Sequence, residues 1–83
     1  MLYVLIPHSS GTTWEACRLF TAYSAAEQAA LCAARDFARM GMNWDWCSII
    51  AYTQGIDELH AVFLYTLIDP TRLQRERLLT PSP

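Results

Sequence analysis

The feature that most constrains this chain is an alanine-rich stretch, "SAAEQAALCAARDFARMG", which begins at Ser24 and ends at Gly41. Ser24 and Glu27 have the spacing of a capping box, in which each side chain accepts a backbone N–H at a helix start. Gly41 is placed as the glycine that ends a helix. The pattern predicts a helix to about residue 40. The residues expected on the inner side of the helix are Ala26, Ala30, Ala33, Phe37 and Met40. Because most of them are small, the helix can lie close to a sheet.

Apolar, β-branched and aromatic runs on both sides of this helix predict strands. The expected strands cover Leu2–Ile6, Trp14–Tyr23, Trp44–Thr53 and Leu59–Ile68. Asp69-Pro70 has the order of an N-cap followed by proline at the first helical position, so a short C-terminal helix over about 70–79 is also expected. The sequence therefore predicts the order β-β-α-β-β, an α+β fold with a four-stranded antiparallel or mixed sheet and one helix on one face. We expect one domain, 1–79, and a flexible tail, 80–83.

Simple dimensions indicate that one face of this sheet needs another cover. Four strands about 4.8 Å apart make a sheet nearly 20 Å wide, whereas a helix is only about 10 Å across. The chain is also rich in apolar residues, with 53% hydrophobic and 17% charged residues, against roughly 25% charged in an average domain. The second face should therefore be covered by the C-terminal segment, by a second copy of the chain, or by a target.

The segment "NWDWCSII" raises the question of what its two tryptophans contact. In a regular strand, side chains two residues apart share a face. Trp44 and Trp46 would then lie with Ser48, Ile50 and Tyr52, opposite the set Cys47, Ile49 and Ala51. Tryptophan packs in cores and is also enriched at binding hot spots, so both interpretations stay open. The candidate contact surface combines aromatic residues with nearby acids: Trp44, Asp45, Trp46, Tyr52, Asp57 and Glu58.

The charge distribution argues against direct nucleic-acid binding. Every cation is arginine, and residues 1–70 carry three arginines against seven acids. Binding to a phosphate backbone needs a basic footprint, which this acidic body lacks. Three arginines near the C-terminus, Arg72, Arg75 and Arg77, are interpreted as solubilising charges, with contact to nucleic acid or membrane as the alternative. No stretch approaches the roughly 20 apolar residues of a membrane span, and the N-terminus lacks the pattern of a signal peptide, so a cytoplasmic protein without membrane contact is expected.

No motif predicts catalysis, a metal site or a cofactor. His8, Ser9 and Ser10 lie in a turn-like segment without the context of a nucleophile. Cys17, Cys32 and Cys47 lack metal-binding spacing and are expected to be reduced thiols. Cys32 falls on the polar side of the predicted helix near Arg35 and Arg39, where cations could favour its thiolate, but an ordinary exposed thiol is the simpler interpretation.

The order of elements resembles small phage-encoded inhibitors. It is carried by a first strand ending in "LIP", a strand running into "LFTAYSAAEQAALCAA", and the aromatic-rich hairpin "WDWCSIIAY…HAVFLYTLI". In layout, residues 2–68 are similar to some anti-CRISPR proteins directed at type I surveillance complexes. The resemblance implies a non-enzymatic inhibitor that occupies a protein surface, and it transfers no site residues.

Two hypotheses about function follow. In the first, the protein is a non-enzymatic inhibitor encoded by a phage or mobile element, which binds a bacterial protein or ribonucleoprotein complex. In the second, it is a homodimeric regulatory or small-ligand-binding domain whose uncovered sheet face forms the dimer. An enzyme is not expected.

Overall fold

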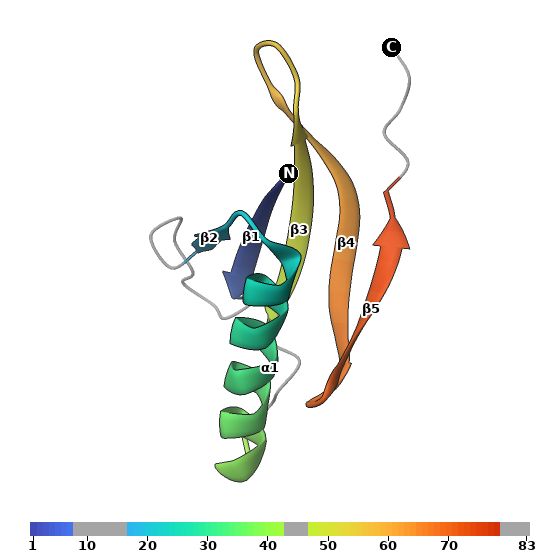
Figure 1. The fold of residues 1–83 in the computed structure, drawn as a ribbon. Helices are drawn as coiled ribbons and strands as arrows, with labels where there is room; N and C mark the ends of the chain where they lie inside the picture. Colours follow the sequence, from blue (N-terminus) through green and yellow to red (C-terminus); the bar gives the residue numbers. More distant parts are fainter. Residues whose placement is uncertain (8–16, 43–46, 79–83) are drawn as a thin grey trace.

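The computed structural model of the chain describes residues 1–7, 17–42 and 47–78, and all structural statements below concern these residues. They form one helix and a five-stranded antiparallel sheet with the strand order β2-β1-β3-β4-β5 (Figure 1). The elements are β1 (Leu2–Pro7), β2 (Arg18–Phe20), α1 (Tyr23–Arg39), β3 (Cys47–Gln54), β4 (Leu59–Asp69) and β5 (Arg72–Arg77). The predicted α+β class is confirmed, with a fifth strand added to the expected four.

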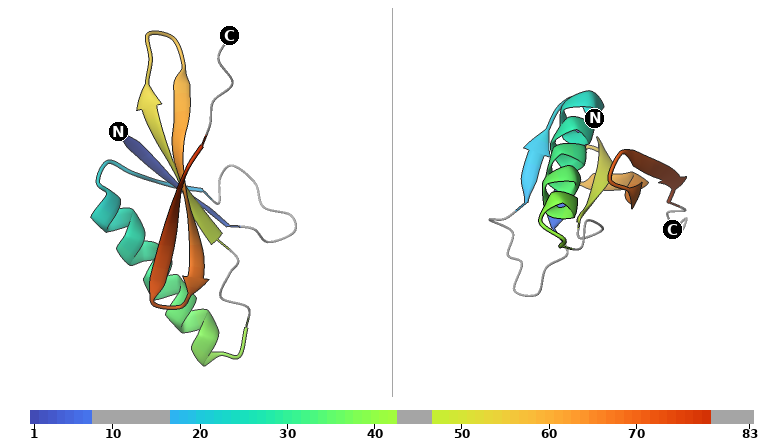
Figure 2. Two further views of the ribbon diagram at one scale, coloured as in Figure 1. Left: turned by 90° about the vertical axis from the view of Figure 1, so that its right-hand side faces the viewer. Right: turned by 90° about the horizontal axis from the view of Figure 1, so that it is seen from below.

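The helix covers one face of one half of the sheet. It packs on β1, β2 and β3, while β4 and β5 extend to the side of it (Figure 2). Its contact stripe is made of three alanines without exposed surface, Ala26, Ala30 and Ala34. Small side chains at this spacing let the helix backbone lie close to the strands, as the sequence predicts, although Ala34 takes the place expected for Ala33.

The helix ends as predicted, but it does not begin as predicted. Gly41 has a φ of +71°, and the N–H groups of Gly41 and Met42 donate to the carbonyls of Ala38 and Phe37, which is a Schellman motif. At the other end, Ala22 is the N-cap and no side chain caps the helix. The predicted capping box of Ser24 and Glu27 is therefore wrong.

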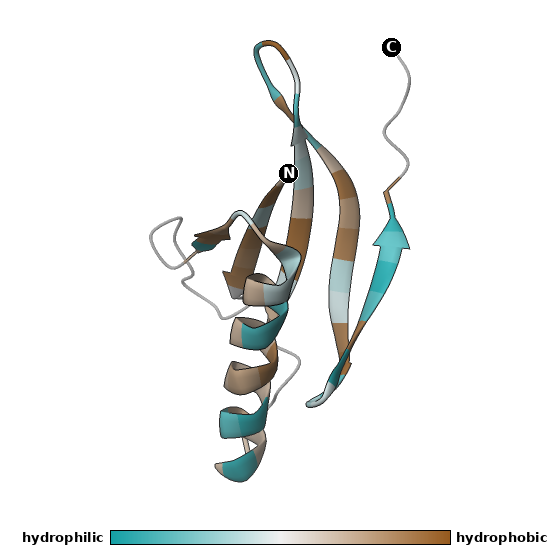
Figure 3. Ribbon diagram, viewed as in Figure 1, coloured by the Kyte–Doolittle hydropathy of each residue, from teal (hydrophilic) through white to brown (hydrophobic). Residues whose placement is uncertain are grey.

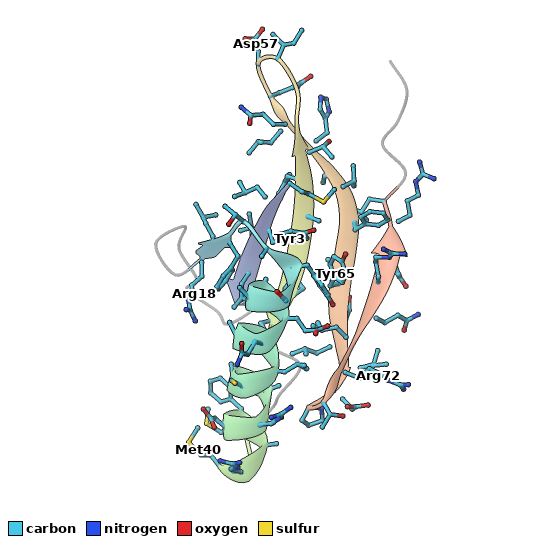
Figure 4. The ribbon with its side chains drawn as sticks, in the orientation of Figure 1. Tyr3, Arg18, Met40, Asp57, Tyr65 and Arg72 are labelled. Atoms are coloured by element: carbon cyan, nitrogen blue, oxygen red, sulfur yellow. The ribbon has the colours of Figure 1, made fainter. Side chains whose placement is uncertain are left out.

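Two residues of the predicted inner stripe are more exposed than expected. Met40 is 63% exposed and Phe37 is half-buried. The last turns of α1 extend past the end of β1, so the strands on which the helix packs do not reach Met40 (Figures 1 and 4). The volume of the core comes instead from the sheet, where Ile49 has no exposed surface and Leu5, Tyr65 and Leu67 are buried.

The predicted C-terminal helix is wrong, because the segment forms β5. Asp69 does not cap a helix: its carboxylate Oδ1 accepts hydrogen bonds from the Thr71 backbone N–H, at 2.8 Å, and from the Thr71 hydroxyl, at 2.5 Å. These bonds hold a tight turn that returns the chain beside β4. Leu73 then lies opposite Leu67. Pairing with β5 satisfies the backbone of β4, which would otherwise be a long apolar sheet edge.

The predicted strand boundaries hold to different degrees. The first and fourth strands are confirmed within one residue. The second is much shorter than predicted and covers only Arg18–Phe20, with Tyr23 already in the helix. Of the predicted third strand, the part from Cys47 onward is confirmed. Residues 14–16, 44–46 and the tail 80–83 lie outside the described residues.

Candidate functional site

The register of the sheet divides its side chains into two faces. Residues directly opposite each other on neighbouring strands point to the same side. Leu5, Ile49 and Tyr65 are linked in this way and belong to the core under α1, so they define the helix face. The alternate residues of the strands define the other side, here called the open face: Leu2, Val4, Leu19, Ser48, Ile50, Tyr52 and Leu64. The predicted division of β3 into 48/50/52 and 47/49/51 is confirmed.

The helix face is filled by a row of aromatic rings. The Tyr23 ring from α1 lies between Tyr3 and Tyr65, with centroid distances of 5.7 and 4.5 Å, and the Phe63 centroid lies 6.4 Å from that of Tyr65 (Figure 4). The Tyr23 hydroxyl donates a 2.7 Å hydrogen bond to Glu27. Burial, and then the Glu27 carboxylate, raise the pKa of the Tyr23 phenol above its usual value. The aromatic side chains of the helix face are therefore packed against α1 and one another. The open face is the candidate binding surface.

The open face contains an apolar hollow of about 460 Å³, which is lined from β1, β2, β3 and the first residue of β4. Its lining is aliphatic apart from the Cys17 thiol and the Tyr52 phenol, and consists of Leu2, Val4, Cys17, Leu19, Tyr52 and Leu59. Leu19 is 66% exposed and Leu59 is 51% exposed. Large apolar side chains that remain this exposed around a concavity are typical of a surface that binds something.

The β3–β4 hairpin continues the surface beyond the sheet. A β-bulge lies where the register shifts between Ala51 and Tyr52, so that Ala51 pairs with Phe63 but Tyr52 pairs with Ala61. Bulges bend a strand and increase its twist. Beyond the bulge, the hairpin projects past the other strands (Figures 1 and 2). Tyr52, at its base, lines the hollow.

The hairpin tip combines one apolar side chain with two acids. The Gly55 N–H donates to the Glu58 carbonyl at 2.7 Å and closes the turn. Ile56 is 99% exposed, and Asp57 and Glu58 are exposed beside it (Figure 4). The Glu58 carboxylate lies 3.4 Å from Nε2 of His60. Two acidic side chains therefore lie at the far end of the hairpin, whereas the arginines of β5 lie along an outer strand, which is the hydrophilic edge in Figure 3.

The structure brings some of the predicted contact residues together. Tyr52 lines the hollow, and Asp57 and Glu58 lie at the tip of the same hairpin. Trp44, Asp45 and Trp46 lie outside the described residues, so their predicted role stays a prediction. The aliphatic part of the surface was not predicted from the sequence. The signal was present in the alternation of Leu2 and Val4, but strand order was needed to place Leu19 and Leu59 beside them.

Other features of the described residues point less clearly to a ligand. A second hollow of about 510 Å³ lies between α1 and β2, is lined by Arg18, Phe20, Gln28 and Cys32 among others, and contains the exposed Cys32 thiol. No three histidine, cysteine or acidic side chains gather as a metal site within residues 1–7, 17–42 and 47–78. Across those same ranges, no helix has both the length and the apolar character needed to cross a bilayer.

Comparisons with known proteins identify no relative. No protein-family model, no curated protein and no solved structure matches the chain.

Proposed function

We propose that this protein acts without catalysis, by binding another protein or a ribonucleoprotein through its open face and hairpin tip. The observation that supports this most directly is the apolar hollow, with Leu19 and Leu59 exposed at its margin. A protein partner can cover aliphatic residues over this area and also contact a projecting hairpin. Its affinity would come mostly from the apolar centre, while the acids Asp57 and Glu58 would contribute to orientation and association rate.

The target class to test first is a bacterial defence complex. This part of the proposal rests on the resemblance in element order between residues 2–68 and small phage-encoded inhibitors of type I surveillance complexes. An inhibitor of this kind would act in the cytoplasm of a host bacterium. It would need only to occupy a surface that the complex uses.

The test is a plasmid-transformation assay in a bacterium with an active type I system that targets the plasmid. Expression of the protein should restore transformation. Leu19→Asp should abolish the effect, because it places a charge beside the hollow. Met40→Asp is the matched control: Met40 has a similar exposed fraction, 63% against 66%, but lies at the end of α1, away from the open face. If the Leu19→Asp variant still restores transformation, the open face is not the binding surface. If the wild type does not restore transformation, this target class is excluded.

Capture from bacterial lysate tests the broader part of the proposal. Tagged wild-type protein, Leu19→Asp and Met40→Asp would be compared by quantitative mass spectrometry. The expected partner is enriched by the wild type and Met40→Asp but not by Leu19→Asp. If the three baits retain the same proteins, the proposed binding surface is wrong.

A small apolar ligand is the second candidate occupant, and the size of the hollow favours it. Ligand sites commonly have volumes of about 300–1,000 Å³, a range that includes the 460 Å³ of this hollow. The probe would be an environment-sensitive naphthalene dye, added to wild type and Leu19→Asp at equal concentration. Saturable fluorescence with the wild type alone would favour this function, and equal signals would exclude the hollow as a ligand site.

A further inference from the structure

The sheet ends in two edge strands of different length. β2 has three residues, Arg18–Phe20, and β5 has six, Arg72–Arg77. β5 is the last strand of the sheet and lies beyond β4 (Figure 1). An edge strand presents backbone N–H and C=O groups that can pair with another chain. Within the part of the chain that the structure describes, β5 is therefore the longer site for an added strand.

The pairing with β4 decides which backbone groups of β5 point outward. The Leu78 N–H donates to the Val62 carbonyl at 3.0 Å, so these two opposed residues are a hydrogen-bonded pair. Such pairs alternate along antiparallel strands, and the residues between them direct their N–H and C=O groups away from the neighbouring strand. By this alternation and the register of β4 with β5, the outward groups belong to Leu73, Arg75 and Arg77. They lie along about 13 Å of edge.

The same three residues place their side chains on the helix face. Arg75 lies opposite Tyr65, which belongs to the core under α1, and opposed residues share a face. Leu73 and Arg77, two residues away on either side, share it too. Arg75 and Arg77 are exposed, and neither forms a salt bridge with a carboxylate of the described residues. Glu76 lies between them and points to the open face. The edge therefore alternates positive, negative and positive charge, with the two signs on opposite faces.

This charge pattern selects the partner. A second copy of the chain, paired antiparallel through the same three residues, would place Arg75 opposite Arg75, and like charges directly opposite each other are destabilising. A nucleic acid would supply negative charge but no regular N–H and C=O groups for the edge, and Glu76 would repel its phosphates. An extended peptide satisfies both conditions, because its backbone pairs with the edge and its alternate side chains share a face. Acids at two alternate positions would then lie beside Arg75 and Arg77.

We propose that β5 binds an extended acidic segment of another protein, which adds to the sheet as an antiparallel sixth strand. The acids of this segment lie opposite Arg77 and Arg75, and a basic residue between them lies opposite Glu76. Antiparallel pairing is the more stable arrangement per residue. The site is at the opposite end of the strand order from β2 and the hollow, so it does not depend on the proposed function.

Amide NMR titration with two end-blocked peptides of the same composition tests the site. In antiparallel register, TEKETVT places glutamates opposite Arg77 and Arg75 and its lysine opposite Glu76, whereas TEEKTVT exchanges one glutamate with the lysine. TEKETVT should shift the backbone amides of Leu73, Arg75 and Arg77 and slow their hydrogen exchange, while the amide of Leu19 on the open face stays unchanged. TEEKTVT should bind at least about threefold more weakly, because it puts like charges opposite each other at two positions.

A charge exchange tests the arginine directly. Arg77→Glu should weaken the binding of TEKETVT by about threefold or more. TKKETVT, with lysine at the facing position, should bind Arg77→Glu more tightly than it binds the wild type. Arg39→Glu makes the same change at the end of α1 and should leave both affinities unchanged. The amide spectrum of each variant shows whether the fold is retained. If Arg77→Glu unfolds, the two peptides of equal composition still decide on the wild type.

Three results would overturn the proposal. One is the absence of shifts at the edge amides up to about 5 mM TEKETVT, a concentration at which even millimolar complexes form. Another is equal binding of TEKETVT and TEEKTVT, since the attraction would then be general rather than set by the strand register. The third is an oligothymidylate that shifts the same amides at lower concentration than TEKETVT, which would assign the arginines to nucleic acid.

Discussion

The guanidinium carbon of Arg75 lies 4.7 Å from the centroid of the Phe63 ring, although the residue directly opposite Arg75 on β4 is Tyr65. The residue opposite Phe63 is Arg77. The cation–π contact is therefore diagonal across the two strands. It covers the ring of Phe63 at the end of the aromatic row, where α1 does not reach.

This arrangement predicts that the two arginines are not equivalent. Arg75→Gln should lower the free energy of unfolding by about 0.5–1 kcal/mol, the usual contribution of an exposed cation–π pair. Arg77→Gln removes the same charge from the same strand and is the control, with a smaller expected effect. Urea unfolding of both variants at one protein concentration checks this. Equal losses would mean that the contribution comes from general charge rather than from the Phe63 contact.

The second prediction concerns the alanine stripe. Ala30 has no exposed surface and lies between α1 and the sheet, so Ala30→Leu adds volume where there is none. Overpacking of this kind typically costs about 1–3 kcal/mol. Ala38→Leu makes the same change at an exposed position of α1 and should be nearly neutral. Thermal melts of the two variants distinguish packing from helix propensity. If Ala30→Leu melts with the wild type, the helix does not lie as close to the sheet as described.

Elements that depend on neighbouring residues were predictable from the sequence, whereas those that depend on distant contacts were not. The helix end at Gly41 was predictable because the Schellman motif depends on adjacent residues and a positive φ. The fourth strand was predictable because its apolar run is long. The segment after Asp69 was not, because the order Asp-Pro is compatible with both a helix cap and a tight turn. The hydrogen bonds of Asp69 to Thr71 and the pairing of Leu73 with Leu67 decide between them.

The candidate surface shows the same limit. Tyr52, Asp57 and Glu58 could be selected from sequence because they lie close together in one hairpin. Leu19 comes from a different strand, and only the order β2-β1-β3 places it on the same face as Tyr52. Without strand order, alternation assigns each residue to one side of its own strand but does not show which sides combine. The hollow could therefore not be predicted.

The third prediction follows from the uncapped start of α1. Ala22 is the N-cap and has extended backbone angles, φ −122° and ψ +133°, but no side chain to accept an N–H. Ala22→Asp should stabilise the protein by about 0.5–2 kcal/mol, because a carboxylate at this position can accept such a hydrogen bond. Ser24→Ala should change stability by less than about 0.5 kcal/mol, since Ser24 is exposed inside the first turn. The opposite ranking in urea unfolding would restore the capping box.

The fourth prediction concerns the turn between β4 and β5. The Thr71 hydroxyl and backbone N–H, which donate to the Asp69 carboxylate, lower the pKa of Asp69. The turn should therefore be favoured above the usual pKa of an aspartate and weaken as the pH falls through the lowered value. Thr71→Val removes the hydroxyl donor and should bring the pKa of Asp69 back toward its ordinary value in a carbon-detected NMR titration. Thr66→Val, at an exposed position in β4, is the control. An unchanged Asp69 titration in Thr71→Val would contradict the role of the hydroxyl.

The last prediction uses the one buried thiol among the described residues, that of Cys47 at the start of β3. Burial raises its pKa from 9.0 to about 11. The folded protein therefore keeps the thiol neutral at a pH where the unfolded chain loses the proton. The contribution to stability is fully present below pH 9 and is lost as the pH rises toward 11.

Urea unfolding under reducing conditions at about pH 8 and pH 10 measures this contribution. A thiol that ionises only in the unfolded chain costs roughly 1.4 kcal/mol for each pH unit above its unfolded pKa. The wild type should therefore lose about 1 kcal/mol more than Cys47→Ala between these two values, because the loss that comes from Tyr23 is the same in both proteins. Cys32→Ala, at the exposed thiol of α1, should lose as much as the wild type. Equal losses in all three proteins would show that Cys47 ionises in the folded state as readily as in the unfolded chain.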